Sequence, residues 1–201
     1  MDVRKQIIEE LKHSVLSVKE AELDTLCDYI LQAPKVIVYS RGRVGLAMKA
    51  FAMRLNHLGL CGRFLGDITT PAIGKGDLLL VGTSLGFPSS FERFMDIAHY
   101  NGASVIGFTS NPEGPLWQKA EATVNIPARA FTSHPEEFEG REITDPAEVR
   151  AVELLHMPSV QPMCSTFEQA LLLVLDYTVL KLQQRLGQSE QQLRDRHANI
   201  L

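Results

Sequence analysis

Two short segments of the chain combine glycines with side chains that bind anions. The first is SRGRVG at residues 40–45, and the second is GTSLGFPSS at residues 82–90. Each follows an apolar run and leads into a helical pattern, and helix N-termini with close-approaching backbone amides favour negative charge. Together the segments predict a phosphate site with these candidate residues: Ser40, Gly42, Arg43, Thr83, Ser84, Gly86, Ser89 and Ser90.

Each segment taken alone has an equally good structural explanation, because a tight turn from a strand into a helix needs glycine in any protein. The first segment also departs from the fingerprint of dinucleotide-binding proteins. Its glycines fall only at positions 42 and 45, and no acidic residue closes the short predicted strand at residues 63–65. We therefore expect a phosphate group and no nicotinamide cofactor.

Two further side chains are candidates for proton transfer. Glu168 lies near the start of a strongly apolar predicted helix at residues 166–184, where a carboxylate shielded from water can act as a general base. The alternative is a carboxylate that interacts with the helix dipole or forms a capping box with Ser165. His197 lies in a polar tail with no core of its own to join, so it either completes the active site of a neighbouring subunit or remains solvated.

These residues belong to a chain with the composition of an ordinary globular protein. It has 201 residues, of which 45% are hydrophobic and 22% are charged, and we expect one domain with a substantial core. The formal net charge of -4 excludes the overall positive field that nucleic-acid binding requires. No apolar stretch approaches the roughly 20 residues that span a bilayer. We expect neither nucleic acid nor a membrane as a partner.

The N-terminal segment and the cysteines indicate the compartment. Charged residues interrupt the apolar ones throughout residues 1–18, so this stretch predicts an amphipathic helix rather than a signal peptide. Cys27, Cys61 and Cys164 show neither the pairing of a disulfide framework nor the spacing of a zinc site. We therefore expect a cytoplasmic protein without a bound metal.

Strands and helices alternate through much of the chain. After N-terminal helices at residues 1–33, a core at residues 35–127 alternates apolar runs with helical spacing. The expected strands are residues 35–39, 63–65, 77–81, 103–108 and 122–126. This alternation predicts a doubly wound, flavodoxin- or Rossmann-like α/β sandwich of three layers, with a mostly parallel sheet between the helices. Both glycine segments then lie at the carboxyl ends of strands, where ligands of this fold class bind.

The remainder of the chain does not continue this alternation. Residues 128–160 are polar and acidic, and we expect a long loop or lid there with at most one helical turn. Residues 161–201 hold the apolar helix, which Gly187 ends, and the polar tail. Because the helix is apolar on more than one face, the sheet, a partner subunit or both must cover it.

Six blocks of the sequence are informative as a set. They are SRGRVG at residues 40–45, AFAMRLNH at 50–57, TPAIGKGD at 70–77, QPM at 161–163, FEQ at 167–169 and RHAN at 196–199. In these blocks the chain resembles the 6-phospho-3-hexuloisomerases, a family of SIS (sugar isomerase) domains. The blocks keep their order along nearly the whole chain, which makes the resemblance far more specific than any single motif.

The resemblance implies a single SIS domain built on a five-stranded parallel sheet, assembled as a homotetramer. It implies a sugar-phosphate isomerase that interconverts a 3-hexulose 6-phosphate and fructose 6-phosphate through an enediolate, without a metal or an organic cofactor. Glu168 matches the glutamate of the family and becomes the first candidate for the catalytic base. His197 matches the histidine of the family's tail, which agrees with a role in a neighbour's site.

The glycine segments also differ from the family pattern. Val44 stands in place of serine and Ser40 in place of glycine, and the side chains of Leu85, Phe87 and Pro88 cannot form the hydrogen bonds of the residues they replace. Neighbouring hydroxyls of the second segment offer substitutes. These differences leave a second function open, a sensor or regulatory SIS protein that binds a sugar phosphate without converting it.

Overall fold

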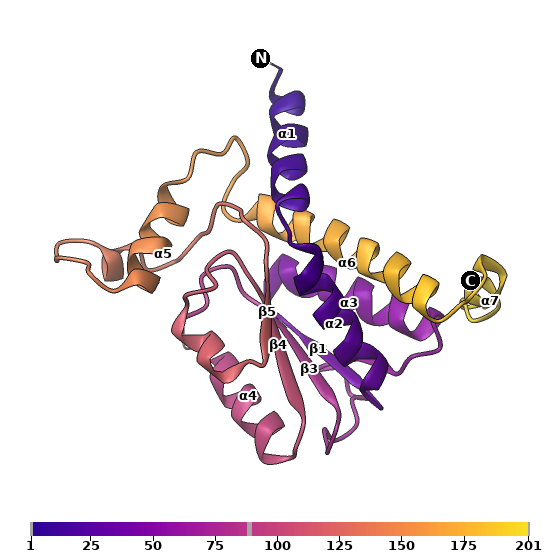
Figure 1. Ribbon diagram of the computed structural model, residues 1–201. Coiled ribbons are helices and arrows are strands. Elements are labelled where there is room, and N and C mark those ends of the chain that lie inside the picture. Colours follow the sequence, from indigo (N-terminus) through magenta and orange to yellow (C-terminus); the bar gives the residue numbers. More distant parts are fainter. Residues whose placement is uncertain (1, 88–89, 201) are drawn as a thin grey trace.

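The computed structural model describes residues 2–87 and 90–200, so Pro88 and Ser89 lie outside the described residues. Helices and strands alternate along the chain as expected (Figure 1). The elements are α1 (Val3–Leu16), α2 (Glu20–Gln32), β1 (Val36–Tyr39), α3 (Gly42–His57), β2 (Gly62–Phe64), β3 (Leu78–Gly82), α4 (Ser90–Tyr100), β4 (Ser104–Thr109), the 3-10 helix η1 (Pro115–Lys119), β5 (Ala122–Asn125), the 3-10 helix η2 (Pro135–Phe138), α5 (Pro146–His156), α6 (Ser165–Arg185) and α7 (Glu190–Asp195).

The strands form one parallel sheet in the order β2-β1-β3-β4-β5. Val38 of β1 pairs with Leu80 of β3, and Leu80 pairs with Ile106 of β4. The central strands are almost wholly apolar, because a parallel sheet that is covered on both faces presents no side to water. This arrangement confirms the predicted doubly wound α/β fold with five parallel strands.

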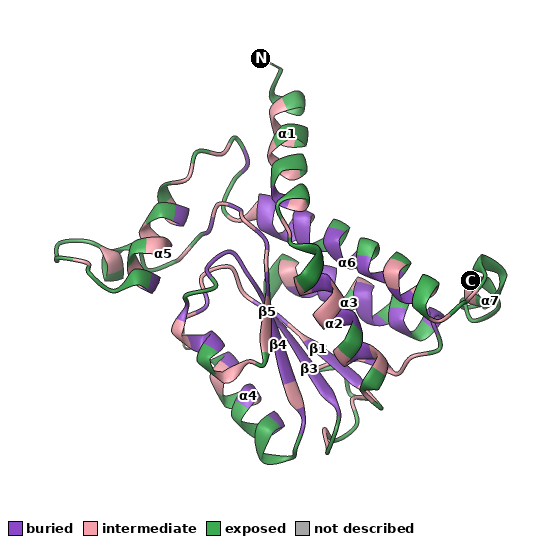
Figure 2. Ribbon diagram, in the orientation of Figure 1, coloured by how far each residue is buried: buried purple, intermediate pink, exposed green. Residues whose placement is uncertain are grey.

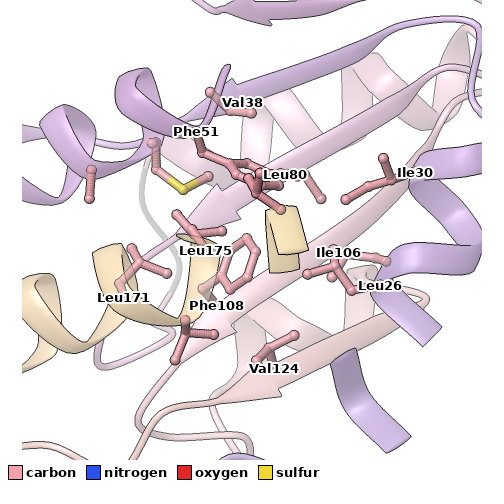
Figure 3. Close-up of a cluster of buried hydrophobic side chains, with 14 of the residues drawn as sticks. Leu26, Ile30, Val38, Phe51, Leu80, Ile106, Phe108, Val124, Leu171 and Leu175 are labelled. Atoms are coloured by element: carbon pink, nitrogen blue, oxygen red, sulfur yellow. The ribbon is translucent and has the colours of Figure 1, made fainter. Parts of the chain in front are cut away.

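Alternate residues of each strand point to opposite faces of the sheet and enter two cores. On one face, Val38 packs with side chains from α2, α3 and α6, including Phe51 and Leu171 (Figure 3). On the other face, Ile37 packs with α4 and with Trp117 of η1. The predicted layers are therefore present, with three helices on the larger core.

Helix α6 is apolar on two sides, and the chain buries only one of them. One side of it is buried against the sheet and α3, with Phe167 and Val174 among the covered residues. The other side carries large apolar residues that are 39% to 55% exposed, namely Leu172, Leu173, Tyr177 and Leu180. The chain itself thus covers only part of the apolar surface of this helix.

The acidic segment at residues 128–160 contains more structure than we expected. In place of a single helical turn, it holds η2 and the 11-residue helix α5. Asp145 caps α5 by accepting hydrogen bonds from the amides of Ala147 and Glu148 at 2.9 and 3.2 Å. Figure 2 shows that most of the segment is exposed or half-buried. The buried residues Ala147, Ala151 and Leu154 follow a helical spacing, so the sequence did carry a signal for this helix. The polar and acidic composition of the rest of the segment obscured it.

A substitution in β4 tests the packing of the smaller core. A Cβ atom added at Gly107 would lie 2.3 Å from Cζ3 of Trp117, whose ring is held by a 3.1 Å hydrogen bond from its Nε1 to the carbonyl of Asn111. Because the ring is pinned, we expect Gly107→Ala to lower the free energy of unfolding by about 1–3 kcal/mol in urea titrations. Gly74→Ala is the control, since its Cβ would meet only an ordinary contact at 3.7 Å. Equal stability of the two variants would contradict this packing.

Candidate active site

The candidate site lies where the order of the strands reverses. β1 and β3 are neighbours in the sheet, yet the chain continues from β1 to α3 on one face and from β3 to α4 on the other. Ligands of doubly wound folds bind at the carboxyl ends of the strands at such a point. The Ser40 hydroxyl donates a 2.6 Å hydrogen bond to the carbonyl of Gly82, which ties these two strand ends together.

The first glycine segment turns sharply from β1 into α3. Gly42 begins the helix with a φ of +56°, a left-handed conformation that glycine adopts without strain. The Arg41 guanidinium donates to the hydroxyl of Ser90, the first residue of α4, and lies over the ring of Phe91 at 5.4 Å. Arg41 therefore bridges the two segments that the sequence singled out.

The second glycine segment is held from its other side by β4 and η1. The Thr109 hydroxyl donates to the carbonyl of Ser84 at 3.1 Å. Gly86 lies so close to the indole of Trp117 that an added Cβ would be 2.3 Å from its Nε1. These contacts fix the backbone of the segment through residue 86 before any ligand binds.

The same contacts leave side chains of the second segment available. Neither hydroxyl of Thr83 and Ser84 has a hydrogen-bond partner among the described residues, and both residues are partly exposed. Hydroxyl donors beside the N-termini of α3 and α4 can bind the oxygens of a phosphate group. Ser90 lies at the same edge of the sheet, whereas the predicted Ser89 lies outside the described residues.

Glu168 lies in the first turn of α6, and only 7% of its surface is exposed. Its carboxylate forms an ion pair with the guanidinium of Arg43 in the first turn of α3. The alternative of a capping box with Ser165 is wrong, because Ser165 is the first helical residue and Cys164 precedes it without a side-chain capping bond. The fold therefore joins Glu168 to the first glycine segment.

A cavity of about 210 Å³ opens beside this ion pair, between α3 and α6. Its lining consists of Arg43, Leu46, Ala47, Ala50, Glu168, Gln169 and Leu172. A carboxylate with little access to water on the wall of such a cavity can accept a proton from a bound carbon acid.

His197 lies far from Glu168 within the same chain. Its ring packs against that of His57, with ring centroids 5.0 Å apart, at the C-terminal end of α3. The guanidinium of Arg196 supports this docking by donating to the carbonyl of His57 at 3.0 Å. Glu168 pairs with Arg43 at the opposite end of α3, roughly 21 Å away along the helix. One chain does not bring the two predicted catalytic residues together.

The acidic segment touches the second glycine segment directly. Phe138 of η2 packs edge to face on Phe87, with ring centroids 5.5 Å apart. The Asn111 amide nitrogen donates to the carbonyl of Leu85 at 3.1 Å and to that of Ala147 in α5 at 3.0 Å. A cavity of about 400 Å³ lies between these parts, with Phe87 and Ala147 in its lining. The segment is thus anchored next to the proposed phosphate site.

Residues 2–87 and 90–200 contain neither a cluster of metal-ligating side chains nor a membrane-spanning helix. No three His, Cys, Asp or Glu side chains in that part of the chain are grouped as metal ligands. None of the helices described there has the length and apolar character to cross a bilayer.

The sequence did not predict two sets of contacts, those of Arg41 and those of Glu10. Arg41 was only one of two guanidinium groups in the first segment, and nothing distinguished its contact with Ser90 from solvation. Glu10 of α1 accepts hydrogen bonds from residues 149 to 156 positions away, including Ser159 and Thr166 at the start of α6. No local pattern predicts contacts over that separation.

The buried contact of the tail makes stability depend on pH. Burial lowers the pKa of His57 from its usual 6.5, and the charges of Arg54 and His197 lower it further. The unfolded chain therefore binds this proton more readily, so the stabilisation is complete above about pH 6.5 and is lost as the pH falls through the lower folded pKa. In urea titrations at pH 7.5 and 5.5, we expect His57→Gln to show a smaller loss of stability on acidification than the wild type. The exposed His156→Gln should behave as the wild type, and equal losses in all three would contradict the assignment.

Known proteins resemble the chain along nearly its whole length, although no family model matches it. It is 31% identical over 195 residues to 3-hexulose-6-phosphate isomerase of Bacillus subtilis, covering 97% of this chain and 95% of that one. It is 34% identical over 192 residues to 3-hexulose-6-phosphate isomerase of Mycobacterium gastri, covering 96% and 86%.

A solved structure agrees with these relatives. A protein of Methanococcus jannaschii, whose crystal structure infers a molecular function of 3-hexulose-6-phosphate isomerase, superimposes with a TM-score of 0.72 at 27% identity, covering 100% of this chain and 98% of that one. Sequence identity above 30% over most of both chains, together with this agreement in fold, shows that the chain belongs to the 3-hexulose-6-phosphate isomerase family of SIS-type sugar-phosphate isomerases.

Proposed function

We propose that the chain is a sugar-phosphate isomerase that interconverts 3-hexulose 6-phosphate and fructose 6-phosphate. The observation that carries this proposal is the buried carboxylate of Glu168, paired with Arg43 of the first glycine segment beside a cavity. The family membership supports the same chemistry, since two relatives that span nearly the whole chain have this activity in their names.

The phosphate of the substrate binds at the switch point of the sheet in this proposal. The hydroxyls of Thr83 and Ser84 donate to its oxygens, and the N-termini of α3 and α4 face its negative charge. Arg41 and Arg43 add positive charge at the same edge. The full proposed binding set is Ser40, Gly42, Arg43, Thr83, Ser84, Gly86, Ser89 and Ser90.

Proton transfer converts one ketose into the other. Glu168 removes the proton from C2 of the 3-hexulose, the electrons of that C–H bond form a C2=C3 double bond, and the C3 carbonyl oxygen becomes an enediolate oxygen. The C2 hydroxyl then gives up its proton while C2 becomes the carbonyl carbon, and Glu168 returns a proton to C3. A second group must carry the proton between the two oxygens, and we assign this step to His197 of a neighbouring subunit.

Assembly follows from the same assignment. His197 lies at the end of α3 opposite to Glu168, so a second copy of the chain has to bring a histidine to each site. The exposed apolar side of α6 offers surface for such contacts. We propose a homotetramer in the cytoplasm, which agrees with free cysteines at positions 27, 61 and 164.

The alternative function of a sugar-phosphate sensor rests on the differences in the second glycine segment, and the relatives do not favour it. Leu85 and Phe87 place apolar side chains in the second glycine segment, and the Phe87 ring packs against that of Phe138. A sensor would bind the sugar phosphate without turnover and would not need Glu168. Measuring turnover therefore separates the two functions.

The shared site can be tested by mixing two inactive variants. Light scattering should give a mass of roughly 90 kDa, four times the 22.4 kDa of one chain. Glu168→Gln and His197→Gln should each retain little activity alone. Unfolding them together and refolding the mixture should restore part of the wild-type activity, because some sites then combine an intact Glu168 with an intact His197. A monomeric mass, or no recovery in the mixture, would contradict the shared site.

The role of Glu168 as the base predicts a specific loss. Glu168→Gln keeps the shape of the side chain but cannot accept a proton, so kcat should fall by roughly two to four orders of magnitude while the sugar phosphate still binds in calorimetry. Glu153→Gln is the matched control, because it removes the carboxylate of another ion pair, with Arg150 on α5, away from the site. Unchanged turnover in folded Glu168→Gln would exclude this base.

A further inference from the structure

Helix α6 starts without a side-chain cap at its N-terminus. Its first turn carries Glu168, and Cys164 precedes the helix without a side-chain capping bond. The residue before it, Met163, has a φ of 53°, a left-handed conformation that is strained for a residue with a side chain. Something other than a local cap has to hold this turn.

A carboxylate from the other end of the chain takes that place. Glu10 of α1 accepts four hydrogen bonds, from the Ser159 hydroxyl at 2.8 Å, the Val160 amide at 2.9 Å, the Gln161 side chain at 3.1 Å and the Thr166 hydroxyl at 3.2 Å. Three of these donors lie in the strained approach to α6, and the fourth lies in its first turn. These bonds lower the pKa of Glu10 from its ordinary value, against the effect of burial.

The network continues to the residues that flank Glu168. Gln161 donates to the hydroxyl of Thr166 at 3.0 Å and accepts a bond from the side chain of Gln169 at 2.7 Å. Thr166 and Gln161 are each 4% exposed, so these bonds are shielded from water. Glu10 thus holds both Thr166 and, through Gln161, Gln169, which lie on either side of the catalytic carboxylate.

The helix that supplies Glu10 lies mostly outside the cores, although Leu11 and Val15 pack against the larger one. Only Ser14 of α1 is buried, and Figure 1 shows its N-terminal half projecting beyond the sheet and α6. In Figure 2 this half is largely exposed. A charged residue that is half-buried on this helix and saturated with hydrogen bonds therefore points to a role at its contact with α6.

We propose that Glu10 is a positioning residue for the reaction, which holds the first turn of α6 so that the Glu168 carboxylate faces the reacting carbons. This inference rests on the proposed function, since it assigns no chemistry to Glu10 itself. A misplacement of a catalytic group by about 1 Å can cost roughly 100-fold in rate. Loss of Glu10 therefore reduces kcat more than it affects substrate binding at the sheet edge.

Glu10→Gln is the variant of choice, because it keeps the length of the side chain but turns one acceptor into a donor that faces other donors. We expect kcat to fall by about 10- to 100-fold with KM changed by less than about threefold. Glu9→Gln is the matched control, since Glu9 is the adjacent exposed residue and, among the described residues, its ion-pair partner is Lys12 in a surface contact of 3.2 Å. It should retain wild-type kinetics.

A double variant separates positioning from general weakening of the fold. If Glu10 acts through Glu168, then Glu10→Gln in a Glu168→Gln background should lower kcat by less than about twofold further. Amide hydrogen exchange at residues 165–169 should also become faster in Glu10→Gln and not in Glu9→Gln. Ser159→Ala, which removes one donor and keeps the carboxylate, should show a smaller fall of about two- to fivefold in kcat if Glu10→Gln does not fold.

The outcomes distinguish the two proposals. A wild type without turnover would overturn the isomerase function. If amide exchange at residues 165–169 is still faster in Glu10→Gln than in Glu9→Gln, the contact of Glu10 with α6 stands. An active wild type with unchanged kcat in Glu10→Gln, or a full 10- to 100-fold loss that persists in the Glu168→Gln background, would overturn the positioning role.

Discussion

The ion pair between Arg43 and Glu168 is the contact on which the arrangement of the site depends. It joins the first turns of α3 and α6, two helices that otherwise meet through apolar side chains of the larger core. A carboxylate as buried as Glu168 needs a charged or hydrogen-bonding partner, because an unpaired buried charge costs several kcal/mol. Since Arg43 directly follows the glycine turn after β1, the pair places Glu168 next to the strand ends. Helix α1 reinforces that placement from the other side through Glu10.

Helix α3 separates Glu168 from His197 within one chain. Its N-terminus carries Arg43, whereas its C-terminus carries His57, on which His197 of the tail docks. A single chain therefore holds Glu168 and His197 near opposite ends of this helix. In our proposal activity depends on assembly, and the apolar residues left exposed on α6 offer surface for it.

The features that could be predicted from the sequence are those that depend on a few neighbouring residues. The strands and the turns at residues 40–45 and 82–86 follow from apolar runs and glycines, which act over a few residues. Helix α5 was missed although Ala147, Ala151 and Leu154 follow a helical spacing, because the segment around it is polar and acidic. The contact of Arg43 with Glu168 could not be predicted, since the two residues are 125 positions apart. Ser165 was a wrong cap because α6 begins one residue earlier than a capping box needs. Contacts of that range depend on the completed fold.

Exchange of carbon-bound hydrogen with solvent tests the central claim most directly. Fructose 6-phosphate is incubated with the enzyme in D2O, and the hydrogen at C3 is followed by NMR. An enediolate formed by Glu168 requires that this C–H bond be broken, so deuterium should enter at C3 with the wild type and not with Glu168→Gln. Complete retention of hydrogen at C3, with no 3-hexulose 6-phosphate formed while the sugar phosphate is bound, would contradict an isomerase and indicate a protein that only senses its ligand.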